Sequence, residues 1–251
     1  MQSLLTAIYP AHCASCGETV EGDGGLCGSC WRETQFVFGH ACDLCGVPLP
    51  GDSDGARDHC DACLSIARPW AQGRTALLYK NNGRRLVLQL KHADRPDIAG
   101  PAAVWMAQAA TPLLAPGTLI VPVPAHWTRM VRRRYNQAAE LARALGRVTG
   151  HRVASNALVR SRGGATQEGK SFDERFANLQ GAVRPHPRRA EVLIGRRVLL
   201  VDDVMTSGAT LASTTEAAFA AGASEVRVVT LARVASEGPH TYMSVKGPRA
   251  P

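Results

Sequence analysis

The sequence lacks any apolar run long enough to cross a bilayer. Its first residues, MQSLLTAIYPAHC, also lack the basic start and apolar core of a secretory signal peptide. Aromatic residues are scarce, at 5% of 251 residues, whereas apolar residues make up 45%, which is ordinary for a globular protein. We therefore expect a cytoplasmic protein that does not span the membrane. Its length suits one large domain, or one medium domain with a small appendage.

Acidic residues are in the minority, at 21 against 29 basic residues, which gives a formal net charge of +8. Such a balance is typical of proteins that bind polyanions, either nucleic acid or a ligand with several phosphates, although it also serves solubility alone. The basic residues gather in two clusters: Arg129, Arg132, Arg133 and Arg134, and then Arg184, Arg188, Arg189, Arg196 and Arg197.

Cysteine is absent after residue 63, and the eight cysteines before it form four C-x-x-C pairs. Each pair places two thiolates on one knuckle, and two knuckles complete a tetrahedral Zn²⁺ site. Disulfides are disfavoured by the expected cytoplasmic location, and a redox C-x-x-C would occur singly. The repetition of the pairs favours zinc over these other uses. We predict a structural zinc module with these ligands: Cys13, Cys16, Cys27, Cys30, Cys42, Cys45, Cys60 and Cys63.

Sequential pairing of the knuckles gives two zinc ribbons, although spacing alone leaves interleaved pairing open. The stretches between knuckles, GETVEGDGG and GVPLPGDSDGARDH, hold too few apolar residues to form a core. Bound metal must then supply most of the folding free energy of this module. We assign it residues 1–66.

Residues 198–211, VLLVDDVMTSGATL, combine a short apolar run, an acidic pair, small and hydroxylated residues, and the start of a helix. This pattern predicts a buried parallel strand followed by a loop at a helix N-terminus. Unpaired N–H groups there bind phosphate, and adjacent carboxylates accept hydrogen bonds from a diol or hold Mg²⁺. The segment thus predicts a ribose 5-phosphate site. The alternative is a core strand capped by Asp, with a Ser or Thr N-cap opening the helix.

Apolar segments at 75–80, 118–124, 195–203 and 225–234 alternate with helical patterns, including one over 136–150 that ends at Gly150. Strands that alternate with helices predict an α/β domain with a parallel sheet. We place this domain at 67–235, and its first residues fall in a segment, 66–74, that has the composition of a linker. Residues 236–251 lack periodicity, and we expect a disordered tail.

Two further segments have the composition of ligand loops. HWTRMVRRRYNQ follows the strand that ends near Pro124 and is rich in phosphate donors, unless it is a solvated basic helix face. Residues 160–175 are glycine-rich and polar, which favours either a lid or an ordinary surface loop. The lid candidates are Arg160, Arg162, Gln167 and Lys170.

Residues 198–211 resemble the phosphoribosyl-pyrophosphate (PRPP) motif of the type I phosphoribosyltransferases. That resemblance implies that Asp202 and Asp203 bind the ribose hydroxyls, that Mg²⁺ accompanies PRPP, and that a loop after an early strand binds pyrophosphate. The implied 5-phosphate loop is Thr206, Ser207, Gly208, Ala209 and Thr210. The implied pyrophosphate side is Lys91, Pro122, Val123, Arg133, Asn136 and Gln137.

The cysteines, LQLKH, VPVPAH, RRYNQAAELA, ERFANLQGA and the PRPP motif together resemble the ComF family, named from DNA-uptake competence. The resemblance implies a type I phosphoribosyltransferase fold, a parallel sheet flanked by helices, preceded by a small zinc-ribbon module. It further implies a PRPP-binding, Mg²⁺-dependent protein associated with DNA uptake, a phosphoribosyltransferase if it is an enzyme, with an unidentified acceptor.

The alternative hypothesis is a zinc-ribbon protein that binds single-stranded DNA or acts as a scaffold for DNA-uptake proteins, with a PRPP pocket that is regulatory or vestigial. Zinc ribbons often contact DNA or protein, and basic surfaces track phosphate backbones. The aromatic candidates for stacking on bases are Trp31, Trp70, Trp127 and Tyr135.

Overall fold

The computed structural model describes residues 10–20, 25–53, 55, 57–92, 95–125, 136–160 and 182–235. Several predictions fall outside these ranges: the candidate ligands Arg133, Arg162, Gln167 and Lys170, the aromatic residues Trp127 and Tyr135, and the tail at 236–251.

Four parallel strands form the central sheet, in the order β1 (Gln72–Leu78), β6 (Glu225–Arg233), β5 (Arg197–Met205) and β2 (Leu119–Pro122). The predicted α/β class with a parallel sheet is therefore confirmed. β5 pairs with a strand on each side, and its side chains enter a hydrophobic core on both faces of the sheet, so its sequence contains a continuous apolar run. This position places the acidic pair at the middle of the sheet's carboxyl edge.

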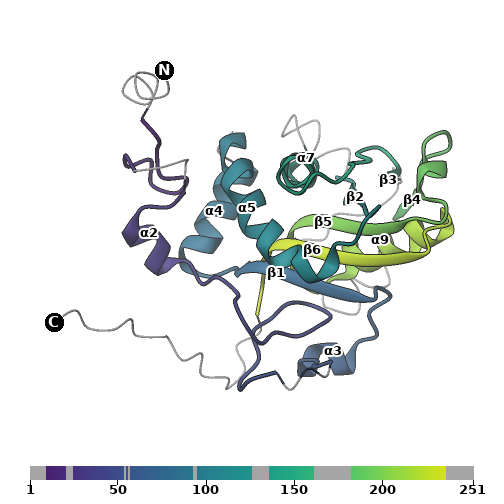
Figure 1. Ribbon diagram of the computed structural model, residues 1–251, viewed down its shortest axis with the longest axis horizontal. Coiled ribbons are helices and arrows are strands. Elements are labelled where there is room, and N and C mark those ends of the chain that lie inside the picture. The colour runs from purple at the N-terminus through teal and green to yellow at the C-terminus, as the bar shows by residue number, and fades with distance from the viewer. Residues whose placement is uncertain are drawn as a thin grey trace.

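Helices cover both faces of the sheet (Figure 1). α4 (Asn81–His92), α5 (Ala99–Ala110) and α7 (Gln137–Thr149) lie above it in that view, and α9 (Ala209–Ala220) packs on the other face. Side chains alternate along β5, with Leu199 and Val201 in the first core and Val198 and Leu200 in the second. The strand that carries the acidic pair therefore lies between two packed cores.

Short elements complete the described fold. The 3₁₀ helices are η1 (Pro96–Ile98), η2 (Thr111–Leu113) and η3 (Ala190–Leu193). β3 (Leu158–Arg160) pairs antiparallel with β4 (Val183–Pro185), and of these two strands the sequence analysis missed β4. Among the described residues, no helix has both the length and the apolarity to cross a membrane.

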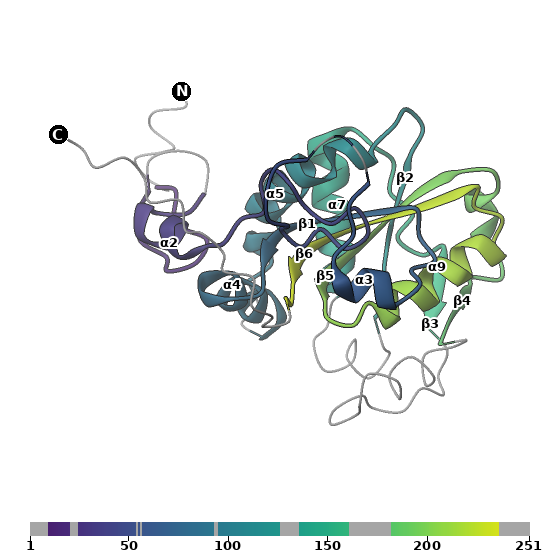
Figure 2. The same ribbon diagram turned by 90° about the horizontal axis from the view of Figure 1, so that it is seen from below.

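The two halves of the cysteine-rich region lie apart (Figure 2): α2 (Gly28–Glu33) contacts α4, and α3 (Asp61–Ser65) lies on the α9 side of the sheet. Between the two helices, residues 35–37 run antiparallel to β1. The Val37 N–H donates to the Ala76 carbonyl at 2.9 Å, and the Leu78 N–H donates to the Gln35 carbonyl at 2.8 Å. A segment of the cysteine-rich region thus extends the central sheet.

The second cysteine group is also built into the core. Cys42 and Cys45 have no exposed surface and pack in the same core cluster as Trp70. Trp70 is only 2% exposed, so this candidate for stacking on DNA bases is wrong. The linker expected at 66–74 is partly wrong as well, because β1 begins at Gln72 and Gly73 lies tight against the Leu44 carbonyl.

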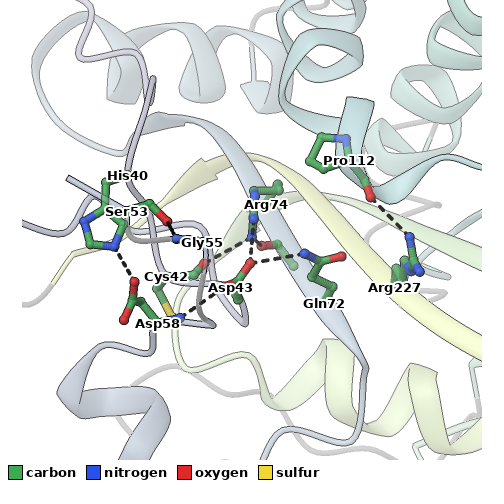
Figure 3. A network of polar contacts seen from close by, with 11 residues as sticks. His40, Cys42, Asp43, Ser53, Gly55, Asp58, Gln72, Arg74, Pro112 and Arg227 are labelled. Atoms are coloured by element: carbon green, nitrogen blue, oxygen red, sulfur yellow. Dashed lines mark hydrogen bonds and ion pairs between the residues drawn. The ribbon is translucent and has the colours of Figure 1, made fainter.

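Asp43 links this cysteine group to β1 through a polar network (Figure 3). Its carboxylate accepts hydrogen bonds from Arg74 Nη2 at 2.6 Å and Gln72 Nε2 at 3.1 Å, while its carbonyl accepts from the Gly73 N–H at 2.7 Å. Burial opposes ionisation of Asp43, but the hydrogen bonds from Arg74, Gln72 and the Asp58 N–H, together with the charge of Arg74, outweigh it and lower the pKa of the carboxyl. The residue between two zinc-ligand candidates is therefore bonded to the central sheet.

Candidate functional site

The acidic pair lies at the carboxyl end of β5, within the strand itself. Lys91 Nζ, at the end of α4, lies 3.2 Å from Asp203 Oδ1, and the Asp203 N–H donates to Asp202 Oδ1 at 2.9 Å. Both members of the ion pair are largely shielded from solvent, at 21% and 13% exposure. Two carboxyl groups and one ammonium group thus lie close together at the carboxyl edge of the sheet.

The two adjacent carboxyl groups do not ionise equally. Burial, followed by the charge of Asp203, raises the pKa of Asp202 from its ordinary value of 3.8 to about 7. The Asp203 N–H and the positive charges of Lys91 and Arg160 act in the opposite direction. Arg160, a lid candidate at the end of β3, therefore acts electrostatically on the acidic pair. A carboxyl with a pKa of about 7 exists in both its protonated and its ionised form near neutral pH, so it can act as a hydrogen-bond donor or only as an acceptor.

After β5 the chain bends through residues 206–208 into α9. Gly208 is the N-cap, with a φ of +81°, a conformation that a residue with a side chain rarely adopts. The N–H groups of Thr206, Ser207 and Gly208 have no acceptor within the described part of the chain. The predicted loop therefore has the unpaired donors of an anion site at the N-terminus of a helix of 12 residues.

Two arginines that the sequence analysis missed hold the carbonyl groups of this loop. Arg233 Nη1, at the end of β6, donates to the carbonyls of Met205 at 3.1 Å and Thr206 at 2.6 Å. Arg68 Nη1 donates to the carbonyl of Ser207. Neither arginine belongs to a recognisable motif, since each acts on backbone groups remote in the sequence.

Residues assigned to the pyrophosphate side meet at the end of β2. Pro122 is paired with Val201, and the Val123 N–H donates to the Val201 carbonyl at 2.9 Å. Asn136 Nδ2 donates to the Val123 carbonyl at 3.1 Å, and its Oδ1 caps α7 by accepting from the Ala138 N–H. The ends of β2, β5 and α7 thus converge next to the acidic pair.

Gln137 lies at the first turn of α7, only 6% exposed. Its Nε2 is a buried donor that has no acceptor among the residues that the structure describes. Lys91, Pro122, Val123, Asn136 and Gln137 are thus placed by the ends of β2, α4 and α7.

The cysteines form two sequential groups of four, in each of which all sulfur atoms lie within 4.8 Å of one another. Zn–S bonds of about 2.3 Å in a tetrahedron require sulfurs about 3.8 Å apart. Cys16 and Cys27 sulfurs are 3.7 Å apart, and those of Cys45 and Cys60 are 3.6 Å apart, with every cysteine free of disulfides. The geometry fits one zinc ion in each group and favours the sequential pairing.

The first cysteine group is fastened to α4 by buried polar contacts. Asn82, 2% exposed, donates to the Cys30 carbonyl at 3.1 Å and to Thr34 Oγ1 at 2.8 Å, and accepts from Ser15 Oγ. Gln89 Nε2 donates to the Ser15 carbonyl at 2.9 Å. The helix that carries Lys91 to the acidic pair is therefore also bonded to a metal-binding knuckle.

Comparison with known families agrees with both parts of this arrangement. Residues 4–64 match the double zinc ribbon domain, and residues 137–248 match the phosphoribosyl transferase domain. The predicted fold, a phosphoribosyltransferase sheet preceded by a zinc-ribbon module, is thus confirmed.

Similar curated proteins include the DNA utilization protein YhgH of Escherichia coli (strain K12), 33% identical over 84% of this chain and 92% of that protein. Competence protein F of Haemophilus influenzae is 30% identical over 90% of this chain and 98% of that protein.

Solved structures with a similar fold share less sequence. The allosteric regulatory enzyme of purine biosynthesis is 20% identical over 57% of this chain and 30% of that chain, with a TM-score of 0.39. A Trypanosoma cruzi hypoxanthine phosphoribosyl transferase is 19% identical over 60% of this chain and 70% of that chain, with a TM-score of 0.34.

Proposed function

Because the chain belongs to the ComF family of phosphoribosyltransferase-like proteins, we propose that it binds PRPP with Mg²⁺ and serves the uptake or utilisation of DNA. The observation that carries the proposal is the pairing of a partly buried acidic pair with a loop of unpaired N–H groups at a helix N-terminus. Carboxylates accept hydrogen bonds from ribose hydroxyls, and N–H groups bind the 5-phosphate. One ligand that carries both groups is a ribose 5-phosphate.

Binding at the pyrophosphate end is assigned to Lys91, Pro122, Val123, Asn136 and Gln137, together with Arg133 outside the described residues. Oxygen donors suit Mg²⁺, so Asp202 and Asp203 are the groups that would hold it or the diol, and the ion would neutralise the leaving pyrophosphate. Lys91 would add a further positive charge for the pyrophosphate, because its ammonium group lies beside Asp203.

If the protein transfers the phosphoribosyl group, positive charge develops at C1 of the ribose as pyrophosphate leaves. The residues of this chain then contribute positioning and charge neutralisation rather than covalent chemistry. Arg160, which already acts on the charge of Asp202, is the described lid candidate. Arg162, Gln167 and Lys170 remain proposals outside the described residues. We propose a glycosyltransferase whose acceptor is to be found experimentally.

A second candidate function is DNA handling, with the PRPP pocket in a regulatory role. The observation that favours it is an exposed aromatic group on the cysteine-rich side. Trp31 is 47% exposed and Phe38 is 58% exposed, with Phe36 between them at ring-centre distances of 4.5 Å and 5.8 Å. Exposed rings stack on the bases of single strands in a sequence-tolerant way.

The test is calorimetric titration of PRPP, with and without Mg²⁺, into the wild type and the Asp202→Asn/Asp203→Asn double variant. We expect Mg²⁺-dependent binding that the double variant loses. Glu216→Gln serves as the control, because this exposed carboxyl lies on α9 away from the acidic pair. Absence of PRPP binding to folded, zinc-loaded wild type would contradict the proposal. DNA affinity that falls steeply with salt would then favour the second candidate.

A further inference from the structure

Three consecutive carbonyl groups of the phosphate loop are occupied by arginine donors. Arg233 bonds those of Met205 and Thr206, and Arg68 bonds that of Ser207. Arg233 is 6% exposed, and the Nε atoms of both arginines are buried without an acceptor among the described residues. Two positive charges therefore lie against the backbone of the loop in a partly desolvated setting.

The planarity of the peptide bond turns these contacts into an orientation of the N–H groups. In a trans peptide the C=O and the following N–H point in opposite directions. Because the Ser207 carbonyl points at Arg68, the Gly208 N–H points away from Arg68. Arg233 fixes the N–H groups of Thr206 and Ser207 in the same manner. These are the three N–H groups that have no acceptor within the described ranges, so the arginines hold them open for an anion.

Arg68 comes from the segment that joins the second cysteine group to β1. Its guanidinium lies 5.4 Å from the ring centre of Trp70, and Trp70 Nε1 donates to the Leu44 carbonyl at 2.7 Å. Leu44 stands between Cys42 and Cys45. An unbroken chain of contacts therefore runs from the second zinc-ligand group to the phosphate loop.

Gly208 shows how closely these parts fit. A Cβ atom at this position would lie 2.5 Å from Arg68 Nη1 and 3.2 Å from the Trp70 ring. The positive φ favours glycine at the start of α9, and a side chain there would also have to displace the guanidinium of Arg68. The loop and the segment beside the second cysteine group are packed as one unit.

We propose that Arg68 is a positioning residue of the phosphate loop and that the second zinc ribbon is, through it, a structural part of the phosphate-binding site. The inference rests on the proposed function, because it assigns the loop to the phosphate of a ribose 5-phosphate. It places the effect of Arg68 at the phosphate end alone. The pyrophosphate end, built by β2, α4 and α7, does not depend on it.

The experiment compares Arg68→Met and Arg68→Lys with wild type by calorimetry, using PRPP, ribose 5-phosphate and Mg²⁺-pyrophosphate as separate probes. Arg32→Met is the matched control, since Arg32 is an exposed arginine of α2 on the first ribbon. Zinc content is measured on every variant, and binding of Mg²⁺-pyrophosphate reports an intact fold at the other end of the site.

We expect Arg68→Met to bind ribose 5-phosphate about ten- to a hundredfold more weakly, the loss of one charge-assisted hydrogen bond, while pyrophosphate affinity and zinc content stay unchanged. Arg68→Lys keeps a donor and the charge, so we expect its affinity for ribose 5-phosphate to lie between those of wild type and Arg68→Met. Unchanged ribose 5-phosphate affinity in Arg68→Met would overturn the role of Arg68 and leave the proposed function standing. An equal loss of affinity for ribose 5-phosphate and for Mg²⁺-pyrophosphate in Arg68→Met would also overturn the role of Arg68. Wild type that binds neither PRPP nor ribose 5-phosphate would instead refute the proposed function.

Discussion

Lys91 Nζ lies 3.2 Å from Asp203 Oδ1 at the carboxyl edge of the sheet, and this contact joins the last turn of α4 to the end of β5. The opposite end of the same helix is bonded through Asn82 to the first cysteine group. The position of the ammonium group is thus set by contacts at both ends of α4. A helix fixed in this way holds its charge in place before any ligand arrives.

Replacing Lys91 with Met should weaken PRPP binding by roughly tenfold, because a partly buried ion pair beside the ligand loses its cation. The pKa of Asp202 should rise further, since the positive charge of Lys91 opposes its protonation. Calorimetry at several pH values measures both effects. Arg85→Met, an exposed change on the same helix, is the control. PRPP affinity equal in the two variants would show that Lys91 plays no part in binding.

PRPP affinity should increase as the pH rises from 6 to 8. The pKa of Asp202 is raised to about 7 in the free protein, so its carboxyl is protonated at pH 6 and ionised at pH 8. Only the ionised form accepts two hydrogen bonds or a cation. Titrations across this range measure the effect, and the dependence should vanish in Asp202→Asn. An affinity that does not vary with pH would contradict this assignment.

Folding stability should respond to Asp202 in the opposite direction. Because the folded pKa lies above the ordinary value of 3.8, the stability contributed by the proton is present below about pH 4 and is lost as the pH rises through 7. Asp202→Asn should therefore raise Tm at pH 8 by a few degrees, since roughly 1 kcal/mol corresponds to about 2–4 °C in a chain of this size. Thermal melts of wild type and Asp202→Asn at pH 5 and pH 8 test this. A Tm at pH 8 that is lower for Asp202→Asn than for wild type would refute the prediction.

Asn82→Ala should destabilise the protein by about 1–3 kcal/mol, because it leaves buried groups of the first cysteine group without partners. Cys30 and Thr34 lose a donor, and Ser15 loses an acceptor. Urea unfolding measures the change. Arg84→Ala on the exposed face of α4 should change stability by less than about 0.5 kcal/mol. Equal effects of the two substitutions would show that the buried contacts contribute little.

The two cysteine groups should differ in what their loss does to the rest of the chain. Cys42 has no exposed surface and belongs to the core below the sheet, whereas Cys16 is exposed. Each substitution to Ser should lower zinc content by one equivalent. Cys42→Ser should also lower Tm far more than Cys16→Ser, because it disturbs a core shared with β5 and α9. Elemental analysis and calorimetry test this; similar Tm losses would mean that both groups are equally coupled to the sheet.

The parts of the site that the sequence predicted are those that depend on neighbours along the chain. The strand, the acidic pair and the loop of residues 198–211 follow one another, so local patterns suffice to identify them. Helix α7 is likewise bounded by Asn136 and by Gly150, whose φ is +72°. The residue roles in ligand binding and the boundary at 66/67 stay predictions.

The parts that the sequence did not reveal depend on contacts between remote segments. Arg68 and Arg233 act on carbonyl groups 139 and 27 residues away, and such contacts leave no periodic signal. The composition of residues 66–74 is typical of a linker, yet the fold buries Trp70 against Leu44. Short strand β4 was missed because three residues, only one of them buried, carry too little pattern.

Residues 35–37 shield the outer edge of β1. The backbone groups of an uncovered edge strand attract other strands, so a sheet that ends in one is prone to join with its neighbours in solution. Here the Val37 N–H and the Gln35 carbonyl satisfy groups of β1 that would otherwise be open. A chain shortened to remove the cysteine-rich region would therefore expose β1 as an unpaired edge strand that can pair with strands of other molecules. Its poor solubility would report the loss of that shield rather than the loss of a ligand site.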